Sequence, residues 1–283
     1  MIRTCLLGLG KTGSVVAEKL LNSSEFDLMS VICKPGSLKT GNPIKRYLNA
    51  ESNLLITEAD ALAEETKQKR FQIAIDFTSP EATLKNAPIL AEKGVHLVIG
   101  TNGFSNHQLQ QLKNLVQHYR IGLVYAPNLS VGINLLLSIV KTIARLIPNY
   151  HVEITETENR NETLSHSGTV IKIADDIKII KEAVRRNRYK LGHKEDISKI
   201  ISFNTVPAEK NYRFHKVRFL GESEEIEILH RSNSGAIYAE GALKAAAFIL
   251  NLKGFYHMED VLLLERMDRD FRLAANRLYL NFN

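Results

Sequence analysis

A largely apolar run followed at once by closely spaced glycines constrains the start of this chain more than any other feature. The run is Ile2–Leu7, and Gly8, Gly10 and Gly13 come directly after it in the pattern Gly-x-Gly-x-x-Gly. The pattern predicts a parallel strand buried on both faces, a tight turn and then a helix. The apolar positions of that helix are Val15, Val16, Leu20 and Leu21.

Glycines at this spacing permit a tight turn, close approach of the backbone to a pyrophosphate, and close packing of a helix on a strand. The helix N-terminus adds N–H groups and positive potential. Glycines in such a turn also occur without a ligand, but the strand before them and the helix after them favour a dinucleotide site. The residues predicted to line it are Gly8, Gly10, Lys11, Thr12 and Gly13.

The end of the second predicted strand, Leu28–Cys33, bears on the choice of cofactor. An acidic residue there would bind the ribose 2′-hydroxyl of NAD, whereas a basic residue suits the 2′-phosphate of NADP. This chain has Cys33 and Lys34 at that point. We therefore predict that NADPH is preferred and that NADH is a possible second cofactor. The alternative is that Lys34 is an ordinary surface lysine beside the turn Pro35-Gly36.

Apolar runs then alternate with helical patterns as far as Tyr125. This alternation predicts a Rossmann-type, doubly wound parallel sheet with helices on both faces. The predicted strands are Asn53–Ile56, Phe71–Phe77, Val95–Ile99 and Ile121–Tyr125, and the predicted helices are one ending near Gln68, Pro80–Lys93 and Asn106–Gln117.

Polar loops follow three of these strands: Asp76–Pro80, Gly100–Phe104 and Ala126–Ser130. Ligands of open α/β sheets bind outside the carboxyl ends of the strands, so we expect the three loops to converge on the cofactor. Their polar residues would serve equally well as helix caps, and Ser130 suits the N-cap of a predicted helix, Val131–Ile147. The predicted cofactor-binding residues are Phe77, Thr78, Gly100, Thr101, Asn102, Ala126, Pro127 and Asn128.

The pattern changes from His151 onward, where short strands predominate. A mixed or antiparallel sheet in a second, α+β domain is predicted from the strands His151–Thr157, Ser202–Val206, His215–Leu220 and Glu225–Arg231, the last two joined by a hairpin turn. An alanine-rich helix, Ala236–Leu250, then returns the chain to the first domain. We therefore predict a dinucleotide-binding domain of residues 1–129 and 237–283, and a substrate-binding and oligomerisation domain of residues 130–236.

The charge of the chain raises the question of a nucleic-acid partner. The net charge is +6 with a pI near 9.2, and the excess is concentrated between Lys178 and Lys194, with Tyr189 as the only interleaved aromatic residue. A solvated helix face is favoured over a polyanion site, so nucleic acid is an unlikely partner.

Composition also bears on location and on metal binding. The longest apolar stretch, Val131–Ile147, is interrupted by Asn134, Lys141 and Arg145, so no membrane span is predicted. No signal-peptide pattern opens the chain, and a cytoplasmic location is expected. Two cysteines, Cys5 and Cys33, lie in predicted strands as small buried hydrophobes and predict neither a disulfide framework nor a metal site.

The loops, in their order and spacing, resemble those of the dihydrodipicolinate reductase family. The members of this family reduce a cyclic imine on the bacterial route to diaminopimelate and lysine. The matching segments are the glycine turn 8–13, Asp76–Pro80, Val98–Phe104, Ala126–Asn134, Ser167–Thr169 and Gly241–Ala246.

The resemblance implies an NAD(P)H-binding domain completed by the last helix, and a substrate domain whose sheet assembles homotetramers. The substrate implied is the anionic imine 4-hydroxy-tetrahydrodipicolinate, which receives a hydride at carbon and a proton from the protein. Ser167, Gly168 and Thr169 would bind one of its carboxylates, since fixed donors at a turn hold an anion without ordering long side chains. The tail 265–283 extends past the match and is predicted to be a packing helix.

One loop departs from the family pattern, which there reads His-His-Arg-His-Lys. This chain has Glu158-Asn159-Arg160-Asn161-Glu162 instead, so Glu158 replaces the proton-donor histidine and Glu162 the lysine. Glutamate there would repel a dianion by a few kcal/mol in a partly dry site. Three interpretations follow. Glu158 or His166 is the acid, with Arg160 binding carboxylate; the fold reduces a less anionic or a cationic imine, for which Glu158 and Glu162 would be counter-charges; or the protein binds cofactor without turnover.

Overall fold

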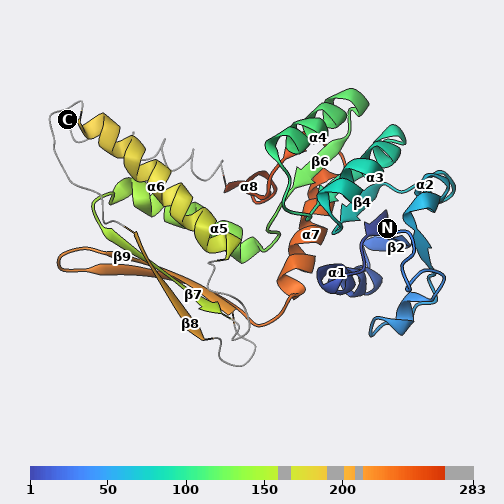
Figure 1. The fold of residues 1–283 in the computed structure, drawn as a ribbon, viewed down its shortest axis with the longest axis horizontal. Helices are drawn as coiled ribbons and strands as arrows, with labels where there is room; N and C mark the ends of the chain where they lie inside the picture. The colour runs from blue at the N-terminus through green and yellow to red at the C-terminus, as the bar shows by residue number, and fades with distance from the viewer. Residues whose placement is uncertain (159–166, 190–200, 208–212, 265–283) are drawn as a thin grey trace. The chain divides into compact units, whose positions relative to one another are not determined.

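The computed structural model describes residues 1–158, 167–189, 201–207 and 213–264 (Figure 1). Its backbone divides into two compact units. Unit 1 is Met1–Val131 with Gly235–Leu263, and unit 2 is Gly132–Ser234 with Leu264. The predicted helix in the tail 265–283, and its assignment to the first domain, lie outside the described residues.

Unit 1 is built on a seven-stranded sheet in the order β11-β6-β5-β4-β1-β2-β3. Every neighbouring pair in it is parallel, and the order of β1 to β6 is that of a doubly wound dinucleotide fold. The predicted fold class is confirmed. The strands are β1 (Ile2–Leu7), β2 (Phe26–Cys33), β3 (Ile56–Glu58), β4 (Ile73–Asp76), β5 (His96–Ile99), β6 (Gly122–Tyr125) and β11 (Gly254–Tyr256).

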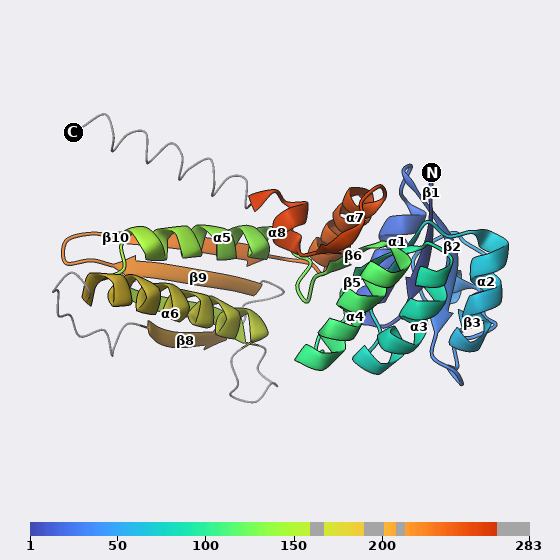
Figure 2. The same ribbon diagram turned by 90° about the horizontal axis from the view of Figure 1, so that it is seen from above.

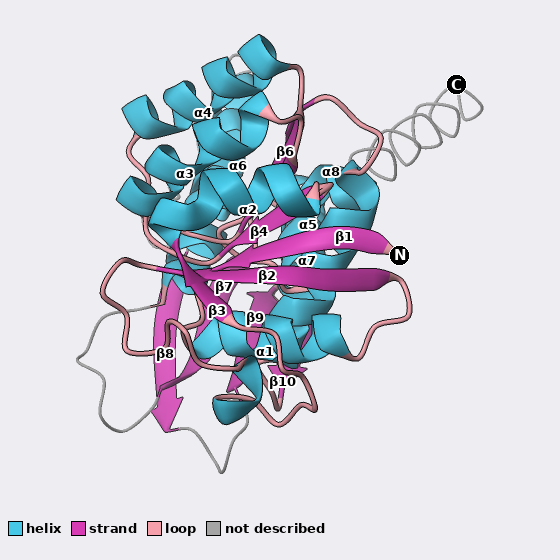
Figure 3. Cartoon of the chain, turned by 90° about the vertical axis from the view of Figure 1, so that its right-hand side faces the viewer, coloured by secondary structure: helices cyan, strands magenta, loops and turns pink. Residues whose placement is uncertain are grey.

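Helices cover both faces of this sheet (Figure 3). Successive residues of a strand point to opposite faces, so Leu6 packs under α1 and α7 while Cys5 and Leu7 pack under α2, α3 and α4. Both faces of β1 are therefore apolar, as a central parallel strand requires. The helices are α1 (Lys11–Leu21), α2 (Leu62–Lys69), α3 (Pro80–Glu92), α4 (Asn106–Tyr119), α7 (Ala236–Ile249) and α8 (Met258–Val261), with short 3-10 turns η1 (Ile44–Arg46) and η2 (Ala59–Ala61).

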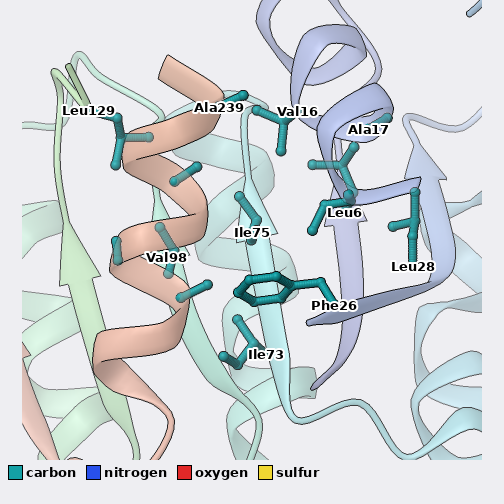
Figure 4. Close-up of a cluster of buried hydrophobic side chains, with 14 of the residues drawn as sticks. Leu6, Val16, Ala17, Phe26, Leu28, Ile73, Ile75, Val98, Leu129 and Ala239 are labelled. Atoms are coloured by element: carbon teal, nitrogen blue, oxygen red, sulfur yellow. The ribbon is translucent and has the colours of Figure 1, made fainter. Parts of the chain in front are cut away.

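Helix α7 approaches the sheet closely because its buried face is made of small residues. Ala239, Ala242, Ala245 and Ala246 are fully buried, and the close-up in Figure 4 shows the helix lying against the strands beside Val98 and Leu129. Gly241 makes the tightest contact, since a Cβ atom there would lie 1.7 Å from the carbonyl oxygen of Leu129. Helix α7 thereby supports the loop that follows β6.

Two details of unit 1 differ from the sequence-based expectation. Strand β3 begins at Ile56, so most of the predicted segment Asn53–Ile56 precedes it. The edge strand β11, Gly254–Tyr256, was not predicted. Its three residues carry no alternating pattern, and only the parallel pairing with β6 makes them a strand.

Unit 2 is a four-stranded mixed sheet in the order β10-β9-β7-β8, with α5 and α6 on one face (Figure 2). Strand β9 is antiparallel to both of its neighbours, and β7 and β8 are parallel. Val152, Ile154, Val217 and Phe219 form the sheet side of the core. The elements are α5 (Val131–Leu146), β7 (His151–Glu158), α6 (Gly168–Tyr189), β8 (Ile201–Pro207), β9 (Arg213–Leu220) and β10 (Glu225–Ser232).

One residue of the basic run is not on a solvated helix face as predicted. The side chain of Lys181 on α6 is 3% exposed, and its Nζ donates to the carbonyl oxygen of Tyr150 at 2.5 Å. Burial lowers the pKa of Lys181 to about 8. Lys178 is exposed as expected. Among the described helices, none has the length and apolarity that a membrane crossing requires.

The close contact of α7 makes a stability prediction. We expect Gly241→Ala to lower the free energy of unfolding by at least about 2 kcal/mol, because the added methyl overlaps the Leu129 carbonyl and neither backbone segment can yield freely. Gly235→Ala is the matched control, since its nearest contact would be an ordinary 4.0 Å from Val15, and it should cost less than about 1 kcal/mol. Urea unfolding of both variants measures this; equal losses would contradict the packing described here.

Candidate functional site

The glycine turn between β1 and α1 is held tightly against its neighbours at the carboxyl edge of the sheet. The Gly8 N–H donates to the Ile32 carbonyl oxygen at 2.8 Å. Gly8 has φ +91°, and a Cβ atom there would lie 2.4 Å from the Phe77 carbonyl oxygen, so only glycine fits. A Cβ on Gly13 would lie 2.0 Å from the carbonyl oxygen of Gly8. Helix α1 therefore begins at Lys11 with its N-terminus beside the turn.

A buried carboxylate joins the loop after β4 to the loop after β5. Asp76 is 5% exposed, and its Oδ1 accepts from the Thr78 N–H at 2.8 Å, the Thr78 hydroxyl at 2.6 Å and the Thr101 hydroxyl at 2.9 Å. Burial raises the pKa of the Asp76 carboxyl, and the hydrogen bonds from Thr78 and Thr101 oppose that rise. The two threonines are thus brought together, with their hydroxyl groups directed at Asp76.

The loop after β6 continues the same edge. The Ala126 N–H donates to the Ile99 carbonyl oxygen at 2.9 Å, and the Asn128 Oδ1 accepts the Ser130 N–H at 2.9 Å. The ring of Phe77 lies against Gly100, where a Cβ would be 2.4 Å from the ring edge. Gly100, Thr101 and Ala126 thus lie in adjoining loops, as predicted. Asn102 and Pro127 are exposed in them, and cofactor contact by these residues stays a prediction.

The far end of this edge carries three charged residues, and the sequence reasoning missed two of them, Lys39 and Glu58. Lys34 is exposed directly after β2, as predicted. Nearby, the Lys39 Nζ donates to the Leu9 carbonyl oxygen of the glycine turn at 2.5 Å and lies 5.3 Å from the centroid of the Tyr47 ring. A carboxylate is present as well, because parallel pairing sets Glu58 beside Cys33. Glu58 Oε1 accepts the Gly36 N–H at 3.1 Å.

The predicted substrate turn in unit 2 is the start of α6. Ser167 caps the helix, since its Oγ accepts the Val170 N–H at 3.3 Å. Its own N–H donates to the buried Glu156 Oε1 at 3.0 Å. Gly168 and Thr169 are the first two helical residues, and the N–H groups at these positions of an α-helix are not used within the helix. The turn therefore lies at the positive end of a 22-residue helix, and its contact with a substrate carboxylate stays a prediction.

Several predicted catalytic residues cannot be placed. Arg160 and His166 lie in 159–166, outside the described residues, together with Glu162. Glu158 is the last residue of β7, and its side chain is likewise outside what the structure describes. Their proposed roles stay predictions.

The missed residues differ in how well the sequence signals them. Asp76 ends a buried strand and is followed by two residues with hydroxyl groups, Thr78 and Ser79, which is a readable sign of a satisfied carboxylate. Glu58 and Lys39 carry no such signal, because only strand register and the fold of the 34–47 segment bring them to the site. Glu156 lies on the same buried face of β7 as Val152 and Ile154. The two-residue spacing of these positions in the sequence is therefore a sign that Glu156 is buried.

Comparison with known proteins covers both units of the chain. The family model described as dihydrodipicolinate reductase, N-terminus, matches residues 2–129, and the one described as dihydrodipicolinate reductase, C-terminus, matches residues 132–262. The 4-hydroxy-tetrahydrodipicolinate reductase of Methanosarcina barkeri is 34% identical over 267 residues, which are 93% of this chain and 99% of that protein. The enzyme of the same name from Ralstonia nicotianae is 34% identical over 260 residues, covering 89% and 96% of the two chains.

Solved structures share the fold. The dipicolinate-bound dihydrodipicolinate reductase of Paenisporosarcina sp. TG-14 superposes with a TM-score of 0.74 at 20% identity, covering 91% of this chain and 97% of that one. An amine dehydrogenase from Mycobacterium smegmatis has a TM-score of 0.59 at 12% identity, with 90% and 94% covered.

The Asp76 contacts predict a linked loss of stability and cofactor affinity. We expect Asp76→Ala to lower the free energy of unfolding by about 2–4 kcal/mol, because it leaves buried donors of Thr78 and Thr101 without their acceptor. NADPH should bind about tenfold more weakly as the two loops separate, and Asp76→Asn, which keeps an acceptor, should recover part of both losses. Urea unfolding and calorimetric NADPH titration measure this.

The matched control for Asp76 is Asp60→Ala, since Asp60 is 67% exposed and meets Lys85 only at 3.5 Å. We expect that variant to change the free energy of unfolding by less than about 0.5 kcal/mol. If Asp76→Ala behaved like the control, the carboxylate would not hold the loops.

Proposed function

This chain belongs to the dihydrodipicolinate reductase family, and we propose on that basis that it catalyses the NAD(P)H-dependent reduction of 4-hydroxy-tetrahydrodipicolinate to tetrahydrodipicolinate. Unit 1 would bind the dinucleotide, and unit 2 would bind the substrate. One observation carries the proposal: each unit matches one of the two family models and contains a feature suited to its role. Unit 1 has the glycine turn at the carboxyl edge of its sheet. Unit 2 has a capped helix N-terminus after a strand of its sheet.

The proposed reaction adds one hydride and one proton to the imine and releases the 4-hydroxyl group as water. The bound reduced nicotinamide supplies the hydride. The Gly168 and Thr169 N–H groups would hold one substrate carboxylate, and the Asp76-linked loops would form the wall for the nicotinamide. Fixed backbone donors do not have to reorganise during the reaction, which is why such a turn suits a charged substrate.

The proton donor is the least determined part of this proposal. Glu158 and His166 are the candidates, with Arg160 available to pair with a carboxylate. A second function is favoured by the same loop, since Glu158 and Glu162 would suit a cationic or less anionic imine. A third is a cofactor-binding homologue without turnover. The three functions differ in whether NADPH is oxidised and in which imine supports its oxidation.

The activity prediction separates these functions. Full-length protein, incubated anaerobically with NADPH and freshly prepared 4-hydroxy-tetrahydrodipicolinate, should oxidise NADPH well above a no-enzyme control, measured as loss of absorbance of the reduced nicotinamide. Binding of NADPH without oxidation would favour the non-catalytic function. Oxidation only with an uncharged or cationic cyclic imine would favour the second.

A substitution in the turn serves as an internal check on the activity. Thr169→Val should raise KM for the imine about tenfold with a smaller effect on kcat, because it removes a hydroxyl donor to a charged group, worth about 1.5–3 kcal/mol. Thr142→Val is the control, since the Thr142 hydroxyl donates within α5 to the Ser138 carbonyl oxygen at 3.1 Å. Equal KM values for both variants would place the carboxylate elsewhere.

The preference for NADPH would rest on the balance of three charges beside the β2 loop. Lys34 and Lys39 would attract the 2′-phosphate, whereas Glu58 would repel it and accept a hydrogen bond from the 2′-hydroxyl of NADH. Two cations against one carboxylate favour NADPH modestly. They leave NADH as an alternative cofactor.

Two substitutions should move this preference in opposite directions. Lys39→Ala should raise KM for NADPH about tenfold and leave KM for NADH within about twofold, since only the phosphate loses a charge partner. Glu58→Gln keeps an acceptor for the Gly36 N–H and should lower KM for NADPH while raising that for NADH. Steady-state kinetics with both cofactors measure the ratio; an unchanged ratio in both variants would remove these residues from cofactor selection.

We infer that the helix-free face of the unit 2 sheet mediates assembly into a homotetramer. That face carries Arg218, which bridges Glu153 at 2.8 Å and also pairs with Glu225, next to Leu229, which is 41% exposed. Alternating charges and exposed apolar groups suit a self-complementary interface. Light scattering should give about four times the 31.9 kDa chain mass. A cytoplasmic location is also inferred, since the buried thiols Cys5 and Cys33 suit a reducing compartment.

A further inference from the structure

Two histidines and a glutamate form a row across three neighbouring strands of unit 2. Antiparallel register pairs Glu156 of β7 with His215 of β9, and His215 with His230 of β10. Two residues further along each strand, the register repeats in the apolar row Ile154, Val217 and Ile228, which packs under α5 and α6. The ionisable row therefore lies on the same covered face of the sheet.

The two histidine rings are close together and sheltered from water. Their centroids are 6.1 Å apart, and the His230 ring lies so close to Gly132 in α5 that a Cβ there would be 2.6 Å from its Nε2. The Nδ1 atoms of His215 and His230 are buried and have no hydrogen-bond partner among the described residues. Buried polar atoms of this kind are uncommon in folded proteins and call for a functional explanation.

Glu156 connects this row to the turn at the start of α6. The Glu156 side chain is 6% exposed, and its Oε1 accepts the Ser167 N–H at 3.0 Å. Ser167 is the residue directly before the two N–H donors, Gly168 and Thr169, that the proposed function assigns to a substrate carboxylate. A change of charge on these histidines therefore acts through Glu156 on Ser167, which directly precedes the residues proposed to bind the anion.

Burial is the main reason that His215 stays neutral in the free protein near pH 6. Burial lowers the pKa of His215 to about 4; Glu156 acts to raise it, and His230 and Arg213 lower it further. Burial also lowers the pKa of His230. The titratable groups that act on His215 are Glu156, His230 and Arg213. The first turns of the helices that cover this face, Gly132–Leu135 of α5 and Gly168–Ile171 of α6, contain no titratable residue.

The site nevertheless needs positive charge for a dicarboxylate. Where the family pattern has a histidine and a lysine, this chain has Glu158 and Glu162. We propose that the His215–His230 pair supplies the missing charge by taking up a proton when a dicarboxylate binds at Ser167–Thr169, with Glu156 as the connecting group. This inference rests on the proposed function and adds to it the source of charge compensation.

The sign of the effect follows from proton linkage. A nearby anion raises the pKa of a histidine by about 1–3, so the pair binds more protons in the complex than in the free protein. Between a free value near 4 and a bound value of about 6–7, which is the upper part of that range and the value that the inference requires, lowering the pH strengthens binding by up to about tenfold per pH unit. Uptake should be on the order of one proton per site near pH 6 at the upper end of that range.

Titration calorimetry on the full-length protein tests this directly. Dipicolinate, a dicarboxylate that is not reduced, is titrated into the protein saturated with NADPH at pH 6 in MES and in imidazole buffer, whose ionisation enthalpies differ. The difference in observed enthalpy gives the number of protons taken up. We expect uptake of at least about half a proton in the wild-type protein.

Variants assign the proton to the pair. His215→Gln with His230→Gln should keep dipicolinate binding at pH 7 and lose the uptake at pH 6, while the exposed histidine variant His118→Gln should retain the wild-type value. Uptake below about 0.1 proton in the wild-type protein overturns the inference even if the double variant does not fold, and so does unchanged uptake in a folded double variant. If the wild-type protein binds NADPH but no dipicolinate, the proposed function fails as well, so the two failures are distinguishable.

Discussion

The buried carboxylate of Asp76 is the interaction on which the dinucleotide edge of unit 1 depends. A carboxylate at the end of a buried strand is costly unless donors surround it, and here Thr78 and Thr101 supply them from two different loops. The Phe77 carbonyl, one residue further on, lies against Gly8. One satisfied charge therefore fixes the loops after β4 and β5 relative to each other, while Phe77 brings them to the glycine turn.

Unit 2 also has a buried carboxylate that holds a functional segment in place by accepting a hydrogen bond from it. Glu156 is a buried carboxylate on a strand, and it accepts a backbone N–H from the residue that caps α6. In both units a buried acid holds the polypeptide segment to which the proposed function assigns ligand contacts. The difference lies in the neighbours: Asp76 is surrounded by neutral hydroxyl groups, whereas Glu156 stands next to His215, whose charge depends on pH and on what is bound.

The sequence was sufficient for features that local pattern determines. The glycine turn and the alternation of apolar runs with helices follow from residues close together in the chain, such as Gly8–Gly13. The Ser167–Thr169 turn was expected as well, but not that it caps and begins α6. The sequence was insufficient where the register between strands determines which side chains come together. Glu58 reaches the β2 loop only because it pairs with Cys33, and the Glu156, His215 and His230 row exists only across three strands. Lys181 could not be recognised as buried, since Lys178, three residues earlier on the same helix, is also a lysine and is exposed.

The central claim is that a nicotinamide coenzyme lies along the carboxyl edge of the unit 1 sheet and acts on a dicarboxylate held at the α6 N-terminus. A crystal structure of the full chain with NADPH and dipicolinate tests both parts at once. The account predicts the nicotinamide next to the loops at 100–102 and 126–128, and one dipicolinate carboxylate within hydrogen-bond distance of the Gly168 and Thr169 N–H groups. Coenzyme density elsewhere, or a dicarboxylate that leaves this turn empty, would contradict it.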